Sequence, residues 1–164
     1  MTSALRSGLL HLSNAVVEPD WCDYNGHMND AYYAVAFSRA TDALADRIGL
    51  DAAGRAASGR TIYTLALVIR YLREVKAGES LAVYLQVLEH DAKRMRFWLE
   101  MRHAADEHVL ATSEQLIACV DQNGAVPRIA SFLPHMQAAL AAIVAGQAGL
   151  AMPEQAGKGI SLRR

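Results

Sequence analysis

Residues 21–29 (WCDYNGHMN) bring together side chains that can take part in acyl-transfer chemistry. Asp23 supplies a carboxylate, and a positioned carboxylate can attack a carbonyl carbon or deprotonate a water molecule. Gly26 allows a turn with positive φ or the close approach of a ligand to the main chain. An alternative of equal weight, from the residues alone, is that Asp23 and Asn25 form an Asx turn with no catalytic role.

A helix is predicted directly after this segment, over residues 30–48. The backbone amides at its start are a second group that could act on the same substrate as the carboxylate. The apolar residues of the helix recur at helical spacing: Tyr33, Phe37, Ala40, Leu44 and Ile48. Asn29 suits the N-cap and Gly49 suits the end of the helix. Backbone amides at a helix start lack intrahelical acceptors, and the helix dipole favours negative charge there. A carbonyl oxygen that becomes an oxyanion would be stabilised at this place.

The rest of the chain changes from helical to strand periodicity. Strands are predicted over residues 61–71, 80–90, 94–103 and 108–121, with a short first strand over residues 15–18 that ends at Pro19. Short polar links between them indicate antiparallel hairpins. Residues 61–71 are apolar on both faces, so we expect this strand to lie centrally in the sheet. Residues 51–60 are rich in Gly, Ala and Ser and are predicted to form a loop.

These elements predict one α+β domain over residues 1–164, in which a five-stranded antiparallel sheet wraps around one long central helix. A short C-terminal helix is expected over about residues 134–145, because Pro134 suits a first helical position and Gly146 a last one.

Residues 21–29, followed by Ala31-Tyr32-Tyr33, resemble the signature of hot-dog thioesterases of the 4-hydroxybenzoyl-CoA thioesterase type. The order of strand, loop, long helix and four strands is similar to that family over about residues 14–121. The resemblance implies a hot-dog fold that hydrolyses an acyl-CoA thioester to the free acid and CoA, with Asp23 as the catalytic carboxylate. It also implies that the helix-start amides bind the carbonyl oxygen, namely those of His27, Met28 and Asn29. Two routes stay open for Asp23, as nucleophile or as general base.

A closer similarity, to betainyl-CoA thioesterases of carnitine degradation, rests on residues 23–28, 40–44 and 75–79. It implies an acyl group with a trimethylammonium end, which aromatic faces can hold through cation–π attraction. The aromatic candidates for substrate binding are Trp21, Tyr24, Tyr32 and Tyr63, whereas Tyr33 and Phe37 are interpreted as core. The wholly apolar stretch 65–69 departs from these relatives and favours a more hydrophobic acyl pocket as the alternative.

Two polar residues are further candidates for substrate binding. Thr41 can orient a water molecule or the thioester sulfur, although a helical Thr usually bonds its own backbone. Glu114 interrupts the apolar pattern of the last strand. A buried carboxylate needs a partner, and exposure at a sheet edge is the alternative explanation that we favour.

The composition excludes several classes of protein. The formal net charge is −1, so no nucleic-acid or anionic-membrane surface is expected. No apolar segment is long enough to cross a membrane and no signal peptide is evident, which predicts a cytoplasmic protein. Cys22 and Cys119 form no CxxC pair, and the six histidines are dispersed along the sequence. We therefore expect no disulfide, no metal site and no cofactor.

The expected fold exposes one strand edge, which predicts a homodimer, with a tetramer as a further step. Two rival functions remain at this point: a hot-dog hydratase or dehydratase that uses another Asp/His pair, and a non-catalytic acyl-CoA-binding module. The acyl group and its carrier, CoA or acyl carrier protein, also stay open.

Overall fold

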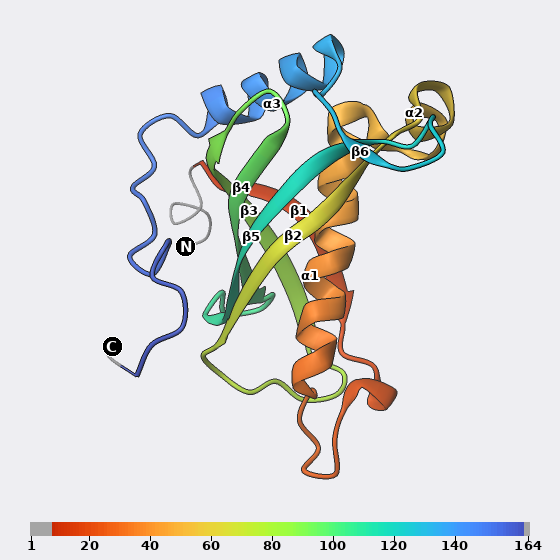
Figure 1. The fold of residues 1–164 in the computed structure, drawn as a ribbon. Helices are drawn as coiled ribbons and strands as arrows, with labels where there is room; N and C mark the ends of the chain where they lie inside the picture. Colours follow the sequence, from red (N-terminus) through yellow and green to blue (C-terminus); the bar gives the residue numbers. More distant parts are fainter. Residues whose placement is uncertain (1–7, 163–164) are drawn as a thin grey trace.

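The computed structural model describes residues 8–162, in which a curled antiparallel sheet wraps around one long helix (Figure 1). The five long strands are β1 (Leu10–Val16), β2 (Arg60–Tyr71), β3 (Ser80–His90), β4 (Arg94–His103) and β5 (Val109–Asp121). They lie in the order β1-β3-β4-β5-β2, and a two-residue strand, β6 (Arg128–Ile129), pairs with the end of β5. The predicted hot-dog architecture is confirmed.

Strand β4 shows how the alternating pattern shapes the sheet. Met95, Phe97, Leu99 and Met101 are fully buried and face the central helix. The residues between them, Arg96, Trp98, Glu100 and Arg102, lie on the outer face because successive side chains of a strand point to opposite sides. The sheet therefore has one apolar face toward the helix and one polar face away from it.

The central helix, α1 (Asp30–Ala45), begins at the residue that the sequence predicts. The side chain of Asn29 accepts a hydrogen bond from the amide of Ala31 (3.0 Å) and so caps the helix. The helical backbone continues as a π-helical turn (Asp46–Leu50), in which Gly49 has a φ of 91°. Phe37, at the middle of α1, is completely buried against the sheet.

The prediction that residues 61–71 form a central strand is wrong, because β2 lies at the edge of the sheet and, among the described residues, pairs with β5 alone. Its apolar side chains divide between two environments. Ile62 and Ile69 pack against the core, whereas Leu65 and Leu67 are 48% and 45% exposed. A strand that is apolar on both faces is expected to be covered on both faces. The sequence does not show whether the second face is covered by this chain or by another one.

The predicted loop at residues 51–60 is also wrong, because a short helix, α2 (Ala52–Ser58), forms there. The Asp51 side chain caps it by accepting the amide of Gly54 (2.7 Å), and Gly59 ends it with a φ of 64°. Four alanines in and around the segment favour helix enough to outweigh Gly54. Strand β1 begins five residues earlier and ends two residues earlier than the predicted strand over residues 15–18, because it pairs along its length with β3 at the other edge of the sheet.

The C-terminal part of the chain covers one end and then the outer face of the sheet. Helix α3 (Pro134–Gly146) packs against the turn that follows α1 and buries Met136 and Leu140, which confirms the predicted C-terminal helix. Residues 147–162, called here the tail, then run along the side of the sheet opposite to α1 (Figure 1). Gln86 and Glu114 on the outer face bond the tail at Ala151 and Gly157. Trp98, between these two residues in the sheet, is only 4% exposed.

Candidate active site

The segment that carries Asp23 folds as a tight hairpin before α1. The amide of Asp23 donates to the carbonyl of His27 (2.9 Å), and the amide of Gly26 donates back to the carbonyl of Asp23 (2.9 Å). Gly26 has a φ of 78°, a conformation that L-residues with a Cβ rarely adopt, so the turn needs glycine at this position. The hairpin thereby brings Asp23 close to the start of the helix.

The hairpin is held against the connection between β2 and β3. Met28 donates its amide to the carbonyl of Val75 (2.8 Å), and His27 lies opposite Lys76 in an isolated antiparallel bridge. The imidazole Nε2 of His27 is 3.3 Å from a carboxylate oxygen of Glu74. This contact ties the His27 ring to the connection between β2 and β3.

The carboxylate of Asp23 is oriented by its own turn. Its Oδ1 accepts a hydrogen bond from the amide of Asn25 (2.8 Å), so the Asx turn named above as the alternative is present. That turn does not exclude catalysis, because it fixes the side chain and uses one of the two oxygens. Within residues 8–162, Oδ2 of Asp23 has no hydrogen-bond partner.

The amides at the start of α1 are occupied differently from the prediction. Met28 and Asn29 donate to the carbonyls of Val75 and Trp21 (2.8 and 2.9 Å), so neither amide is available to a ligand. The third predicted amide, that of His27, has no hydrogen-bond partner within residues 8–162 and is still open to a ligand. The next two donors of the helix, Ala31 and Tyr32, bond to the side chain and the carbonyl of Asn29. In the part of the chain that the structure describes, the amide of Asp30 has no partner. Asp30, the first residue of α1, therefore offers the helix-start amide that can bind an oxyanion.

Asp23 and Asp30 line one pocket of about 310 Å³ at the N-terminus of α1. The other residues that line it come from the hairpin, from α1 and from the end of β2 with its following loop: Asn25, His27, Met28, Tyr33, Tyr71, Leu72, Arg73 and Glu74. The rings of Tyr33 and Tyr71 meet edge to face with centroids 5.2 Å apart. This pocket has a carboxylate, an unpaired helix-start amide and an aromatic wall.

Two tyrosine hydroxyls stabilise this wall. Tyr33 donates to the carbonyl of Arg73 (3.2 Å), and Tyr71 donates to the carbonyl of Asp30 (3.2 Å). Burial, together with the nearby carboxylate of Glu74, raises the pKa of Tyr33 to about 12. Burial and the charge of Asp30 also raise the pKa of Tyr71. Both hydroxyls therefore stay protonated and act as hydrogen-bond donors at neutral pH.

The aromatic residues predicted to bind substrate do not form one cage in the protomer. Trp21 stacks on Tyr32 with centroids 5.5 Å apart, and the guanidinium of Arg39 lies 5.2 Å from the Trp21 ring. Tyr24 is at the tip of the hairpin and is 97% exposed. Tyr63 lies on β2, where its hydroxyl accepts a hydrogen bond from Gln122 (3.2 Å). None of these four residues lines the pocket of Asp23.

Thr41 lines a second cavity, of about 540 Å³, between α1 and β2. Its hydroxyl donates to the carbonyl of Phe37 (3.1 Å), as expected for a helical Thr, and lies 3.2 Å from Oε1 of Gln115. Thr64 and Leu67 form the wall on the side of β2. The cavity opens beside the unpaired edge of the sheet, so a second chain at this edge would change its shape.

Glu114 serves the outer face of the sheet rather than the pocket. The expected explanation, exposure at a sheet edge, is wrong: β5 lies between β4 and β2, and the Glu114 side chain is 12% exposed. Its carboxylate pairs with Arg96 (2.7 Å) and accepts the amide of Gly157 (2.9 Å). Glu114 thus fastens the tail to the sheet.

Three contributors to the pocket were missed in the sequence: the amide of Asp30, Tyr71 and Glu74. Asp30 carried a usable signal, because it follows the predicted N-cap and its amide has no acceptor within a helix. Tyr71 and Glu74 are about forty residues away along the chain and gave no comparable sign. Tyr33, interpreted as core, is buried as expected and also lines the pocket.

Cys22 and Cys119 are free thiols, as expected. Among the described residues, no helix has the length and apolar character needed to cross a membrane.

Comparison with known proteins places the chain in a family. Residues 17–140 match the model of the Thioesterase-like superfamily. The chain is 40% identical over 146 residues to the betainyl-CoA thioesterase of Pseudomonas aeruginosa, covering 89% of this chain and 91% of that protein. It is 38% identical to the L-carnitine dehydrogenase/betainyl-CoA thioesterase of Rhizobium meliloti, covering 96% of this chain but 31% of that longer protein.

Solved structures agree with this placement. A candidate thioesterase of Pseudomonas putida KT2440 is 39% identical and superposes with a TM-score of 0.81, covering 95% of this chain and 98% of the other. A Staphylococcus aureus protein solved in complex with CoA is 25% identical, with a TM-score of 0.86 and coverage of 98% and 99%. The chain therefore belongs to the thioesterase-like superfamily and is a thioester hydrolase built on the hot-dog fold.

Proposed function

We propose that this hydrolase acts on an acyl-CoA thioester whose acyl group is betainyl, and that the reaction takes place in the pocket of Asp23 and Asp30. The observation that carries the site is that two residues line the same pocket: Asp23, whose carboxylate has one uncommitted oxygen, and Asp30, whose helix-start amide is unpaired within residues 8–162. The similarity to a betainyl-CoA thioesterase over nearly the whole chain supports the substrate.

The proposed reaction uses the two groups in different ways. The thioester carbonyl oxygen accepts a hydrogen bond from the amide of Asp30, where the dipole of α1 favours the charge that develops on it. Asp23 either attacks the carbonyl carbon or removes a proton from the water that attacks it. In both routes the C–S bond breaks and the CoA thiolate leaves and takes up a proton that comes from water. In the first route the acyl group is left as a mixed anhydride with Asp23, and water then hydrolyses it to the acid and the free carboxylate. In the second route the attacking water itself supplies the second oxygen of the acid.

The charges of the pocket support a cationic acyl group. Three acidic residues line the pocket, namely Asp23, Asp30 and Glu74. Among its lining residues, Arg73 is the one Arg or Lys. The edge-to-face pair of Tyr33 and Tyr71 adds aromatic surface, which attracts a quaternary ammonium group. We therefore assign the cation–π contact to these two tyrosines, in place of the four aromatics named from the sequence.

A homodimer is part of this proposal. Within residues 8–162, no strand pairs with the outer edge of β2, which exposes Tyr63, Leu65 and Leu67. A second copy paired at the same edge would satisfy the open backbone groups and cover these side chains. The free thiols of Cys22 and Cys119 are in keeping with a reducing compartment, so we place the protein in the cytoplasm.

A thiol-release assay with betainyl-CoA and a panel of uncharged acyl-CoAs tests the proposal. Betainyl-CoA should give the highest kcat/KM, and Asp23→Asn should lower kcat by a factor of at least about 100, typical of the loss of a general base or nucleophile. Asp20→Asn changes an exposed carboxylate three residues earlier and serves as the matched control, with unchanged kcat.

The rival functions give different results in the same assay. A hydratase would convert an enoyl-CoA without releasing thiol, and a binding module would bind acyl-CoA without turnover. Near-normal kcat in Asp23→Asn would remove Asp23 from the mechanism. Faster release from uncharged acyl-CoAs than from betainyl-CoA would reject the substrate while leaving the site intact.

A further inference from the structure

A group of metal-ligating side chains lies outside the pocket, on the hairpin that joins β4 to β5. His103 is the last residue of β4, Asp106 lies in the turn, and His108 precedes β5. Glu107 has a φ of 63°, and no other non-glycine residue in the described part of the chain has a positive φ. The hairpin brings three residues that are separated in the sequence by two and by one position onto the same side of the turn. Two of the histidines that are dispersed along the sequence therefore lie side by side in space.

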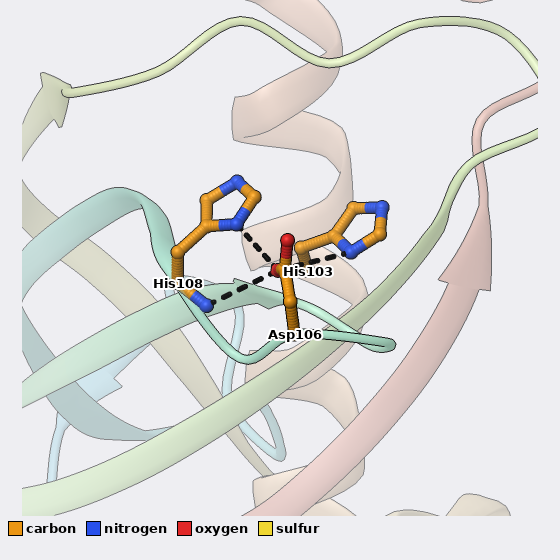
Figure 2. Close-up of side chains that lie close together, drawn as sticks. All are labelled: His103, Asp106 and His108. Atoms are coloured by element: carbon orange, nitrogen blue, oxygen red, sulfur yellow. Dashed lines mark hydrogen bonds and ion pairs between the residues drawn. The ribbon is translucent and has the colours of Figure 1, made fainter.

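The three side chains converge on one point. Nδ1 of His103 is 3.2 Å from Oδ1 of Asp106, and Nδ1 of His108 also contacts this oxygen. The two imidazole rings are parallel within 3° and their centroids are 5.2 Å apart, with the Asp106 carboxylate between their Nδ1 atoms (Figure 2). All three ligand atoms lie within 4.8 Å of one another.

Further groups surround the ring of His103. Oε1 of Glu79 lies 3.7 Å from Nε2, the position from which an outer carboxylate orients a metal-bound imidazole. On the other side of the ring, the amide of Ala105 points at Nδ1 from 3.4 Å. Nδ1 also faces Oδ1 of Asp106 at 3.2 Å, so a cation bound here would be within reach of both atoms.

Two carboxylates lie beside the two imidazoles, those of Glu79 and Asp106. Within residues 8–162, no Lys or Arg side chain forms an ion pair with either carboxylate. The nearby guanidinium of Arg102 is already bonded to Glu100 and to the carbonyl of Glu107. A divalent cation between the imidazoles and Asp106 would be attracted by both carboxylates.

We propose that His103, Asp106 and His108 bind a divalent transition-metal cation of the Zn²⁺ type, and that Glu79 positions His103. Two imidazole nitrogens and one carboxylate oxygen form a ligand set that suits Zn²⁺ and that Mg²⁺ does not prefer. His103 and His108 are 17% and 29% exposed, so solvent can complete the coordination. The site is separate from the pocket of Asp23, none of whose lining residues belongs to it.

Glu79 gives the metal site a connection to the rest of the fold. Its Oε2 accepts the amide of Lys76 (2.6 Å), and Lys76 lies opposite His27 in the bridge that holds the Asp23 hairpin. Binding of a cation at the β4–β5 hairpin would thus stabilise the β2–β3 connection as well. We expect Zn²⁺ to raise the melting temperature of the chain.

Calorimetric titration of the full, untagged chain with ZnCl₂ tests this site directly. Wild type should bind about one equivalent per protomer and should not bind MgCl₂. His108→Ala and Asp106→Asn should each weaken Zn²⁺ binding at least about tenfold, and Glu79→Gln should weaken it roughly 10- to 100-fold, as loss of an outer carboxylate does. His90→Gln, a substitution of an exposed histidine at the far end of β3, should bind as wild type does.

Two outcomes would overturn the site. One is the absence of saturable Zn²⁺ binding by wild type. The other is a binding isotherm of His108→Ala that matches wild type, with equal melting temperatures of the two metal-free chains to show that the variant is folded. Hydrolysis of acyl-CoA does not enter the test, so its outcome is independent of the proposed function.

Discussion

The hydroxyl of Tyr71, the last residue of β2, donates a hydrogen bond to the carbonyl of Asp30, the first residue of α1 (3.2 Å). The two residues are 41 positions apart, and this contact joins the edge strand to the start of the central helix. The amide of Asp30 is the proposed donor to the thioester carbonyl. Tyr71 bonds the carbonyl of the same residue and so helps to fix the position of that amide.

Substitution Tyr71→Phe should therefore affect kcat more than KM. A neutral hydrogen bond contributes about 0.5–1.5 kcal/mol, which corresponds to a fall in kcat of roughly two- to tenfold if all of it serves positioning. Steady-state kinetics of thiol release measure the change. Tyr63→Phe is the matched control, since its hydroxyl bonds to Gln122 outside the pocket. Equal kcat values for the two variants would contradict the positioning role.

The stability of the chain should depend on Tyr33 at alkaline pH. Its pKa is raised from 10.0 to about 12, mainly by burial and then by Glu74, so the folded chain holds this proton more tightly than the unfolded chain. Its contribution is complete below about pH 10 and is lost as the pH rises to about 12, by at most about 3 kcal/mol. Urea unfolding of wild type and Tyr33→Phe at both pH values measures it.

The matched control for this pH effect is Tyr24→Phe, because Tyr24 is almost fully exposed. This variant should lose stability between pH 10 and pH 12 as wild type does, whereas Tyr33→Phe should lose less. The same loss in all three chains would assign the alkaline instability to other groups.

Loss of the helix cap should destabilise α1. Asn29→Ala removes the oxygen that accepts the amide of Ala31, and such substitutions cost about 1 kcal/mol. Denaturant unfolding measures the free energy, and Asn29→Asp should restore most of it because aspartate also caps. If Asn29→Asp is as unstable as Asn29→Ala, the side chain acts in some other way than as a cap.

Charge on the open edge of β2 should prevent dimerisation. In a dimer paired at this edge, the double variant Leu65→Lys, Leu67→Lys would bury two lysine side chains without partners. Light scattering should therefore show a monomer for this variant and a dimer for wild type. Ile129→Lys, at another exposed apolar position on β6, is the control and should remain dimeric. A monomeric wild type at micromolar concentration would refute the dimer itself.

The elements that the sequence predicted well are those governed by local signals. The start of α1 follows from Asn29 and the apolar spacing behind it, and the strand β4 follows from its strict alternation. The positions of β2 and α2 were wrong for different reasons. The place of β2 depends on pairing partners far along the chain, and α2 depends on the balance between alanine propensity and one glycine.

In the candidate site too, the residues set by local sequence could be predicted, and those set by contacts between distant segments could not. Asp23 could be named because it lies in a short segment with a recognisable order of residues. Of the three predicted oxyanion amides, those of Met28 and Asn29 donate to carbonyls of Val75 and Trp21, so the proposal adds the unpaired amide of Asp30. Those bonds depend on how the hairpin packs against other segments, which no local pattern reports. The His103 group escaped notice for a similar reason, since it depends on the shape of one turn.

The tail that crosses the outer face of the sheet gives the chain a built-in optical reporter. The protein has two tryptophans: Trp98 is covered beneath the tail, whereas Trp21 stacks on Tyr32 near the hairpin of Asp23. Emission from Trp98 should shift to longer wavelength when the tail detaches and water reaches the indole. In a Trp21→Phe background, fluorescence therefore separates release of the tail from events at the active site.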